Sequence, residues 1–311
     1  MRTLPILALL CAAACAQEVT PVRERLEKEA KTLLDAQDSG KPCRPDGDSS
    51  AALGSERYVA RATANFRLQG TFTQEQLADF ARIVEAARAD YLKVYEPSEA
   101  RVPARIEVFV FSKQSDFQAW VLACYPGTEE RRRAQLDWGG CFIANPAIMV
   151  SWGDVEYERE CVAHQVTHLL MYLHFGTSLP VWITEAAAAR SGRRLTLRSA
   201  ITCGLVGEEG LSTPKVRDNA VDWNDEIRRW LASGKDVPIA DLEAAQWNAV
   251  GGDAIIKGWS LLEYLAAEHA EGLKKYAKQC ATGETRDWKA AFGVTAEEMN
   301  EMWRKRMVGE K

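Results

Sequence analysis

Two histidines in this chain of 311 residues are spaced so that both can bind one metal ion. They begin and end the segment His164-Gln165-Val166-Thr167-His168. In a helix, residues four apart lie on one face, about 6 Å apart along the axis. Both imidazoles can therefore reach one cation, while the amide of Gln165 beside them cannot take up a proton.

A carboxylate that can complete the site follows in the next predicted helix. The apolar spacing of residues 158–173 predicts a helix, Gly176 ends it, and Pro180 suits the first turn of the helix after it. A hairpin of these two helices can bring Glu185 over the histidines. Two neutral imidazoles and one carboxylate form a common zinc site that leaves a fourth position open.

A histidine pair alone is weak evidence for a metal. The chain has 4 histidines, and an isolated pair on a half-apolar helix is more often a packing feature. The joint pattern favours Zn²⁺: a strand, the histidine helix, a glycine turn, a Leu-Pro-x-Trp segment and then Glu185.

The segment 163–188 resembles the gluzincin metallopeptidases of the peptidase MA clan, in particular their exported bacterial members. Their motif runs His-Glu-x-x-His-x-Leu, then Leu-Pro-x-Trp-x-x-Glu-Gly-x-Ala. The matching stretches are 164–170, HQVTHLL, and 179–188, LPVWITEAAA. A looser likeness extends over most of residues 55–307. The resemblance implies a zincin-like fold in which His164, His168 and Glu185 are the zinc ligands.

Three positions depart from the family pattern. Gln165 replaces the glutamate that acts as general base, Ala186 replaces a glycine, and Ile255 stands where a tyrosine is frequent. Zinc in such a site polarises a carbonyl and acidifies water, and a positioned base adds about 10²–10⁴ in rate. Ala189 also stands where a carboxylate could support the ligands. The retained ligands together with Gln165 predict a pseudopeptidase that binds peptide or protein in its cleft without efficient cleavage. By contrast, Ala186, Ile255 and Ala189 favour a metal-free domain.

Two other functions stay open at this stage. The chain can be an active metallohydrolase with an unusual base, or a metal-free structural or interaction domain of the cell envelope. As substitute bases, Glu158 and Glu160 are expected to be exposed helix charges, and His174 a residue of the surface or helix end. His269 lies near another predicted helix end, where it could fold back to stabilise an oxyanion.

The periodicity of the whole chain predicts an α+β fold. A small mixed sheet with helices occupies the N-terminal half, the second half is mainly helical, and the histidine helix lies between them, lining a cleft. The expected strands are 58–64, 105–111 and 147–152, and the expected helices are 22–36, 73–95, 112–123, 216–233, 239–247, 254–270 and 296–307. The region 37–55 is expected to be a loop.

The expected division has four parts. Residues 1–16 are a signal peptide, 17–54 an N-terminal helix and linker, 55–178 the zincin-like subdomain with the metal-site helix, and 179–311 a helical subdomain that carries the third ligand. With 47% hydrophobic residues the chain can fill one large domain or two closely packed ones. A net charge of −5 gives no reason to expect nucleic-acid binding.

The N-terminus predicts export, to the periplasm or the medium. Arg2 precedes an apolar segment, and small residues stand before a cleavage site after Ala16. Lipidation of Cys15 is the less favoured alternative. Cleavage leaves six cysteines, which permit disulfides in an exported chain: Cys43, Cys124, Cys141, Cys161, Cys203 and Cys280. No segment is apolar for long enough to predict a spanning helix.

Overall fold

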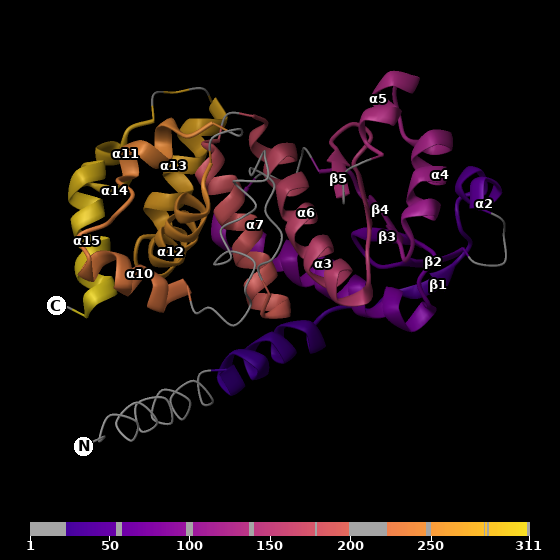
Figure 1. Ribbon diagram of the computed structural model, residues 1–311, viewed down its shortest axis with the longest axis horizontal. Coiled ribbons are helices and arrows are strands. Elements are labelled where there is room, and N and C mark those ends of the chain that lie inside the picture. The colour runs from indigo at the N-terminus through magenta and orange to yellow at the C-terminus, as the bar shows by residue number, and fades with distance from the viewer. Residues whose placement is uncertain are drawn as a thin grey trace, which may run out of the picture.

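The computed structural model describes residues 23–53, 58–97, 102–136, 140–177, 179–198, 223–246, 250–282, 284 and 286–309. A mixed sheet lies in the N-terminal half and helices make up the C-terminal half, as Figure 1 shows. The fold is therefore α+β, as the sequence predicts. The expected signal peptide with Cys15 and Ala16, and also Cys203, lie outside the described residues, as does the segment 216–222 of an expected helix.

Six strands form the described sheet in the order β1-β2-β3-β4-β6-β5. The central pairs β3–β4 and β4–β6 are parallel, and the three outer pairs are antiparallel. Strand β5 is the last in this order, and it lies beside the histidine helix. The strands are β1 (Lys41–Cys43), β2 (Val59–Ala62), β3 (Phe66–Gly70), β4 (Ile106–Phe111), β5 (Gly140–Ile143) and β6 (Ile148–Trp152).

Helices cover both faces of the sheet. Helices α3 (Gln74–Tyr95) and α6 (Val155–Phe175) pack on one face, and α4 (Gln114–Cys124) packs on the other with α2 (Gly47–Leu53) against it. The short α5 (Glu129–Ala134) contacts α4. Because a central parallel strand is covered on both sides, β4 is apolar at nearly every position. Its side chains alternate between two separate core clusters.

The long helix α3 begins where its sequence predicts. The Thr73 side chain accepts a hydrogen bond from the Gln76 backbone N–H, and the Gln76 side chain accepts one from the Thr73 N–H. This capping box satisfies two donors that a helix N-terminus otherwise leaves without partners. The helix ends at Glu96, which adopts the left-handed conformation.

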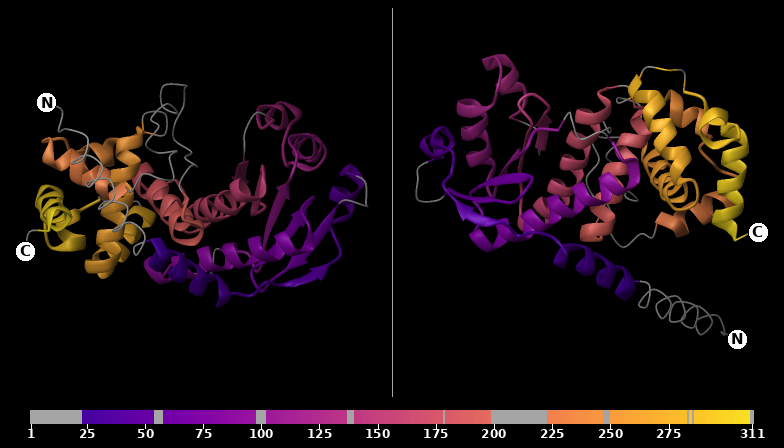
Figure 2. Two further views of the ribbon diagram at one scale, coloured as in Figure 1. Left: turned by 60° about the horizontal axis from the view of Figure 1, so that its bottom comes forward. Right: turned by 180° about the vertical axis from the view of Figure 1, so that it is seen from behind.

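The C-terminal half is a set of helices that covers α7 (Val181–Thr196) from the side away from the sheet (Figure 2). Helix α7 packs on α6 and on α12. At the second contact, a Cβ added to Gly258 would lie 3.3 Å from the Trp182 carbonyl oxygen, so the absence of a side chain allows this close approach. The remaining helices are α10 (Trp223–Ala232), α11 (Ile239–Ala244), α12 (Gly252–Glu268), α13 (Ala270–Thr282), α14 (Trp288–Phe292) and α15 (Ala296–Val308).

A buried lysine joins three parts of this half. The Lys257 ammonium donates to Asp236 Oδ1 and Asn300 Oδ1, both at 2.9 Å, and lies 3.1 Å from the ring centre of Trp303. It thereby ties α12 to α15 and to the segment before α11. Burial lowers the pKa of Lys257 to about 8, although the charge of Asp236 opposes this shift.

The structure corrects the predicted loop at 37–55. This region contains β1 and α2, whose short, polar sequences carry no clear periodicity. The described strands β3 and β5 also went unpredicted. The expected strands at 58–64, 105–111 and 147–152 correspond to β2, β4 and β6. A helix over residues 23–35 and the helices expected at 73–95, 112–123, 239–247, 254–270 and 296–307 are present with small shifts at their ends.

Among the described residues, no helix combines the length and the apolar character needed to cross a membrane.

We predict that Gly70→Ala destabilises the sheet. A Cβ at this position would lie 1.7 Å from the Val110 carbonyl oxygen of β4, so the paired backbones would have to separate. Overpacking of this kind costs about 1–3 kcal/mol, and urea unfolding should show a loss in this range. Gly47→Ala is the control because a Cβ there meets nothing within 4 Å. Equal unfolding midpoints for both variants would contradict the prediction.

Candidate metal centre

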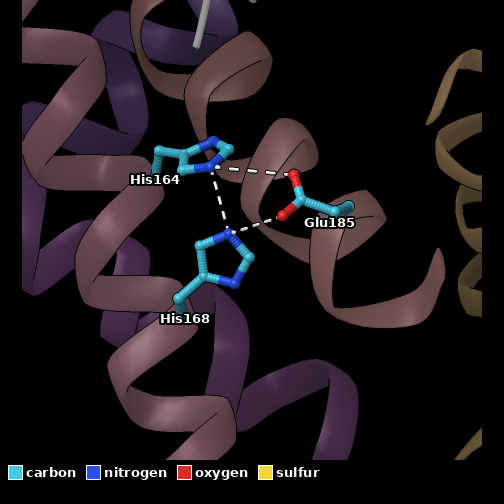
Figure 3. Close-up of side chains that lie close together, drawn as sticks. All are labelled: His164, His168 and Glu185. Atoms are coloured by element: carbon cyan, nitrogen blue, oxygen red, sulfur yellow. Dashed lines mark hydrogen bonds and ion pairs between the residues drawn. The ribbon is translucent and has the colours of Figure 1, made fainter. Parts of the chain in front are cut away.

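Three buried side chains from two adjacent helices converge at one point (Figure 3). The Nε2 atoms of His164 and His168 lie 3.1 Å apart. Glu185 faces both rings, with Oε1 at 3.3 Å from His168 Nε2 and Oε2 at 4.0 Å from His164 Nε2. The three residues predicted from the sequence therefore form a group that can hold a metal ion.

Local sequence explains how the two helices are placed. The Asp154 carboxylate caps the N-terminus of α6 by accepting from the Tyr157 backbone N–H. Gly176 ends α6 with a positive φ of 65°, a conformation that glycine adopts without strain. Pro180 is the N-cap of α7, one position before the predicted first turn, and the following turns carry Glu185 back over α6.

Polar contacts fix the position of α7 beside α6. A hydrogen bond joins the hydroxyls of Thr167 and Ser191, 2.8 Å apart, between the two helices. Arg190 pairs with Asp90 of α3, and its Nε lies 3.2 Å from Glu263 Oε1 of α12. Because Thr167 precedes His168 directly, the interhelical hydrogen bond fixes the helix register next to the site.

The surroundings favour a neutral imidazole at His164. Burial, and then the nearby His168, lower the pKa of His164 to about 3, although the carboxylate of Glu185 opposes this shift. The side chains of His164, His168 and Glu185 are 1%, 3% and 0% exposed. Neutral imidazole nitrogen is the form that binds metal, so His164 needs no deprotonation at physiological pH.

Two of the separations between candidate ligand atoms are close to those around a tetrahedral ion. Zinc binds His nitrogen and carboxylate oxygen at about 2.0–2.1 Å, which for tetrahedral geometry separates two ligand atoms by about 3.3–3.4 Å. The two Nε2 atoms, 3.1 Å apart, and the pair His168 Nε2 and Glu185 Oε1, 3.3 Å apart, are close to that value, whereas His164 Nε2 lies 4.0 Å from the other carboxylate oxygen, Oε2. One donor atom from each of the three residues lies within 4.8 Å of the others, which is close enough for the group to hold one ion.

Gln165, which the resemblance aligns with a general base, is also buried. Gln165 is 5% exposed and follows His164 directly on α6. Its carboxamide can donate and accept hydrogen bonds but cannot carry a proton away. Ala186 lies against α12, where a Cβ at Gly258 would be 3.7 Å from the Ala186 methyl. Ile255 and Ala189 are buried apolar residues.

Two aromatic side chains lie next to the histidine pair, and sequence reasoning did not find them. Phe142 of β5 stacks on the His168 ring, with a centroid distance of 6.3 Å and an angle of 15°. Its ring also lies 6.0 Å from the ring of Tyr172, one helical turn after His168. Only the pairing of β5 with β6 brings Phe142 here, so no local pattern could have shown it.

The structure corrects the expected exposure of three residues on α6. Glu158 and Glu160 are buried, not exposed: Glu158 accepts a hydrogen bond from Ser151 of β6, and Glu160 faces the Arg198 guanidinium at 3.7 Å. His174 is near the helix end, as predicted, but it is buried, with Nδ1 2.8 Å from the Tyr91 hydroxyl.

Two other residues considered from the sequence lie outside the group. His269 is the C-cap of α12, its Nε2 lies 3.0 Å from the Tyr264 hydroxyl, and it does not belong to the candidate metal group among the described residues. Cys161 is fully buried on α6 and is likewise outside that group. Disulfide pairing stays a prediction, since Cys203 lies outside the described residues.

A scan against models of protein families finds no match for this chain, and a search of curated proteins finds none either.

Glu158 gives the protein a pH-dependent stability that can be measured. Burial raises the pKa of Glu158 to about 8, although the hydrogen bond from Ser151 opposes the shift. No described donor contacts its Oε1. The pKa of Glu158 is higher in the folded state than in the unfolded state. Below about pH 4.5 the carboxyl is protonated in both states, and its contribution to the free energy of unfolding is fully present. This contribution is lost as the pH rises from about 4.5 to about 8.

Glu158→Gln should remove this pH dependence. The amide keeps an acceptor for the Ser151 hydroxyl. The wild type should therefore lose stability relative to the variant as pH rises from 5 to 8, by up to about 1.4 kcal/mol per pH unit. Urea unfolding at several pH values measures this difference. A difference that stays constant from pH 5 to 8 would show that Glu158 is ionised in the folded protein.

Proposed function

We propose that this chain is an exported, zinc-binding relative of the gluzincin metallopeptidases that binds a peptide or protein segment without cutting it efficiently. The observation that supports this most is the convergence of His164, His168 and Glu185 beside a glutamine. The metal-binding groups are in place, and the residue that would accept a proton is replaced. Export is proposed from the N-terminal sequence alone.

The geometry supports zinc as the ion at this site. Two imidazole nitrogens and one carboxylate oxygen are a donor set that zinc prefers, and the separations of these atoms suit its tetrahedral bonds. When bound, zinc would polarise a carbonyl oxygen of the ligand. The buried carboxylate of Glu185 is the one negative charge that the three residues contribute, so the loaded site would keep a net positive charge for a ligand oxygen.

The glutamine at position 165 supports a role in peptide binding and argues against efficient peptide hydrolysis. Its amide can hydrogen-bond to a ligand held at the cation, as a glutamate could, but it cannot take a proton from water and pass it to a leaving amine. Loss of a positioned base costs about 10²–10⁴ in rate. Peptide hydrolysis would then be very slow while ligand affinity is retained.

Strand β5 supports an extended peptide as the ligand. It is the last strand in the order of the described sheet, and α6 packs against it. The outer edge of such a strand offers backbone donors and acceptors to an added strand. Next to it, Tyr172 is 40% exposed beside the otherwise buried histidine pair, so we propose that the ligand approaches the site from this side.

Metal analysis tests the first part of the proposal. The purified protein should hold about one zinc ion per chain, and added zinc should raise the Tm of metal-depleted protein. His168→Ala should abolish both effects. His269→Ala is the matched control, because this histidine pairs with Tyr264 and lies outside the candidate metal group. Absence of zinc and of any Tm shift would favour the metal-free domain.

Restoring the glutamate tests the second part. Gln165→Glu should gain peptide cleavage, about 10²-fold or more above the wild type on a peptide library, and chelators should abolish it. The double variant Gln165→Glu with His164→Ala is the control and should be inactive. Chelator-sensitive cleavage by the wild type would instead support an active hydrolase with another base. An inactive Gln165→Glu that binds zinc would show that more than the base is missing.

A further inference from the structure

The alternation of β5 directs Phe142 toward the metal centre. Cys141 and Ile143 belong to the core cluster on the α4 side of the sheet. Phe142 lies between them in sequence and pairs with Met149 of β6, which belongs to the cluster under α3 and α6. Successive residues of a strand point to opposite faces, so Phe142 faces α6.

Phe142 forms a continuous aromatic surface with two residues of α6. Its ring is nearly parallel to that of His168, at 6.3 Å and 15°. On the next helical turn, the Tyr172 ring lies 6.0 Å away at an angle of 59°. The surface thus starts at a candidate metal ligand and continues away from it toward Tyr172.

This surface is accessible, unlike the ligand atoms themselves. His168 is buried, Phe142 is half-buried and Tyr172 is 40% exposed. A single exposed aromatic residue is ordinary on a protein surface. Here the exposed ring is part of an aromatic pair that touches the imidazole of a candidate ligand, which places it where a bound molecule would extend from the site.

We propose that Phe142 and Tyr172 form a subsite for an apolar side chain, preferentially aromatic, of the peptide bound at the candidate metal centre. The proposal rests on the proposed function of that centre. A ligand oxygen held near His168 would place the neighbouring side chain over the two rings. Burying an aromatic ring against them removes apolar surface from water and adds ring–ring contacts, whereas an acidic side chain would lose its hydration without gaining a partner.

A series of small hydroxamates tests the subsite on the zinc-loaded protein. The probes are the hydroxamates of N-acetyl phenylalanine, leucine, alanine and lysine, with acetohydroxamate as the reference without a side chain. Calorimetry should show the phenylalanine probe binding about tenfold tighter than the alanine probe. Phe142→Ala or Tyr172→Ala should reduce this ratio to about threefold or less, while acetohydroxamate affinity changes by less than about twofold.

Two control variants separate the subsite from general effects of substitution. Tyr172→Phe keeps the ring and should keep the ratio. Leu122→Ala removes an apolar side chain of similar exposure, 44%, on α4 at the opposite face of the sheet, and should also keep it. An unchanged ratio in both alanine variants of the subsite, or no preference in the wild type, would overturn the proposal. Tighter binding of the lysine probe than of the phenylalanine probe would show that Phe142 and Tyr172 bind a cation, and this would also overturn the proposal.

Failure of the metal site can be told apart from failure of the subsite. If acetohydroxamate does not bind, the proposed zinc function fails. The side chains are then presented as N-acetyl amides in the presence of EDTA, and contact is measured by saturation-transfer NMR. A stronger signal for phenylalanine than for alanine, lost in Tyr172→Ala, would support the aromatic subsite without the metal. Equal signals would overturn it.

Discussion

The packing of α7 against α6 is the constraint on which the site depends. It buries two imidazoles and a carboxylate with their polar atoms 3.1–4.0 Å apart. Burial of such groups is costly unless they find partners, and here each is the partner of the others. Thr167, Ser191 and Arg190 fix this contact from positions beside the ligands. The core around the two helices therefore determines whether a cation can bind.

Glutamine at position 165, where the peptidases that this chain resembles have glutamate, would change one chemical property and leave the others in place. Glutamine has the size and acceptor of glutamate but no charge and no affinity for a proton. Because Gln165 is not among the three converging ligands, metal affinity and ligand recognition can persist without turnover. This separation is the physical basis of the proposed binding role, for which the aromatic pair beside His168 would be a recognition surface.

Local sequence patterns correctly predicted the structural features that depend on local geometry. The spacing of His164 and His168, the Thr73 capping box and the turn at Gly176 are all fixed by neighbours in sequence. Strands β3 and β5 are short, and their pairing with distant segments is not written in their own pattern. From the sequence, Glu158 is expected to be an exposed charge near the start of a helix. In the structure it is buried and accepts a hydrogen bond from Ser151 of β6, which is a partner from another element. Non-local contacts account for each of these errors.

The near-complete enclosure of the ligand atoms has a kinetic consequence. Each of the three candidate ligands is at most 3% exposed, so an ion held between them could be reached from outside only at its open fourth position. Exchange of that ion would require a transient parting of α6 and α7. Its residence time would then follow the rate of this local opening, and substitutions that loosen the contact between α6 and α7 would shorten it.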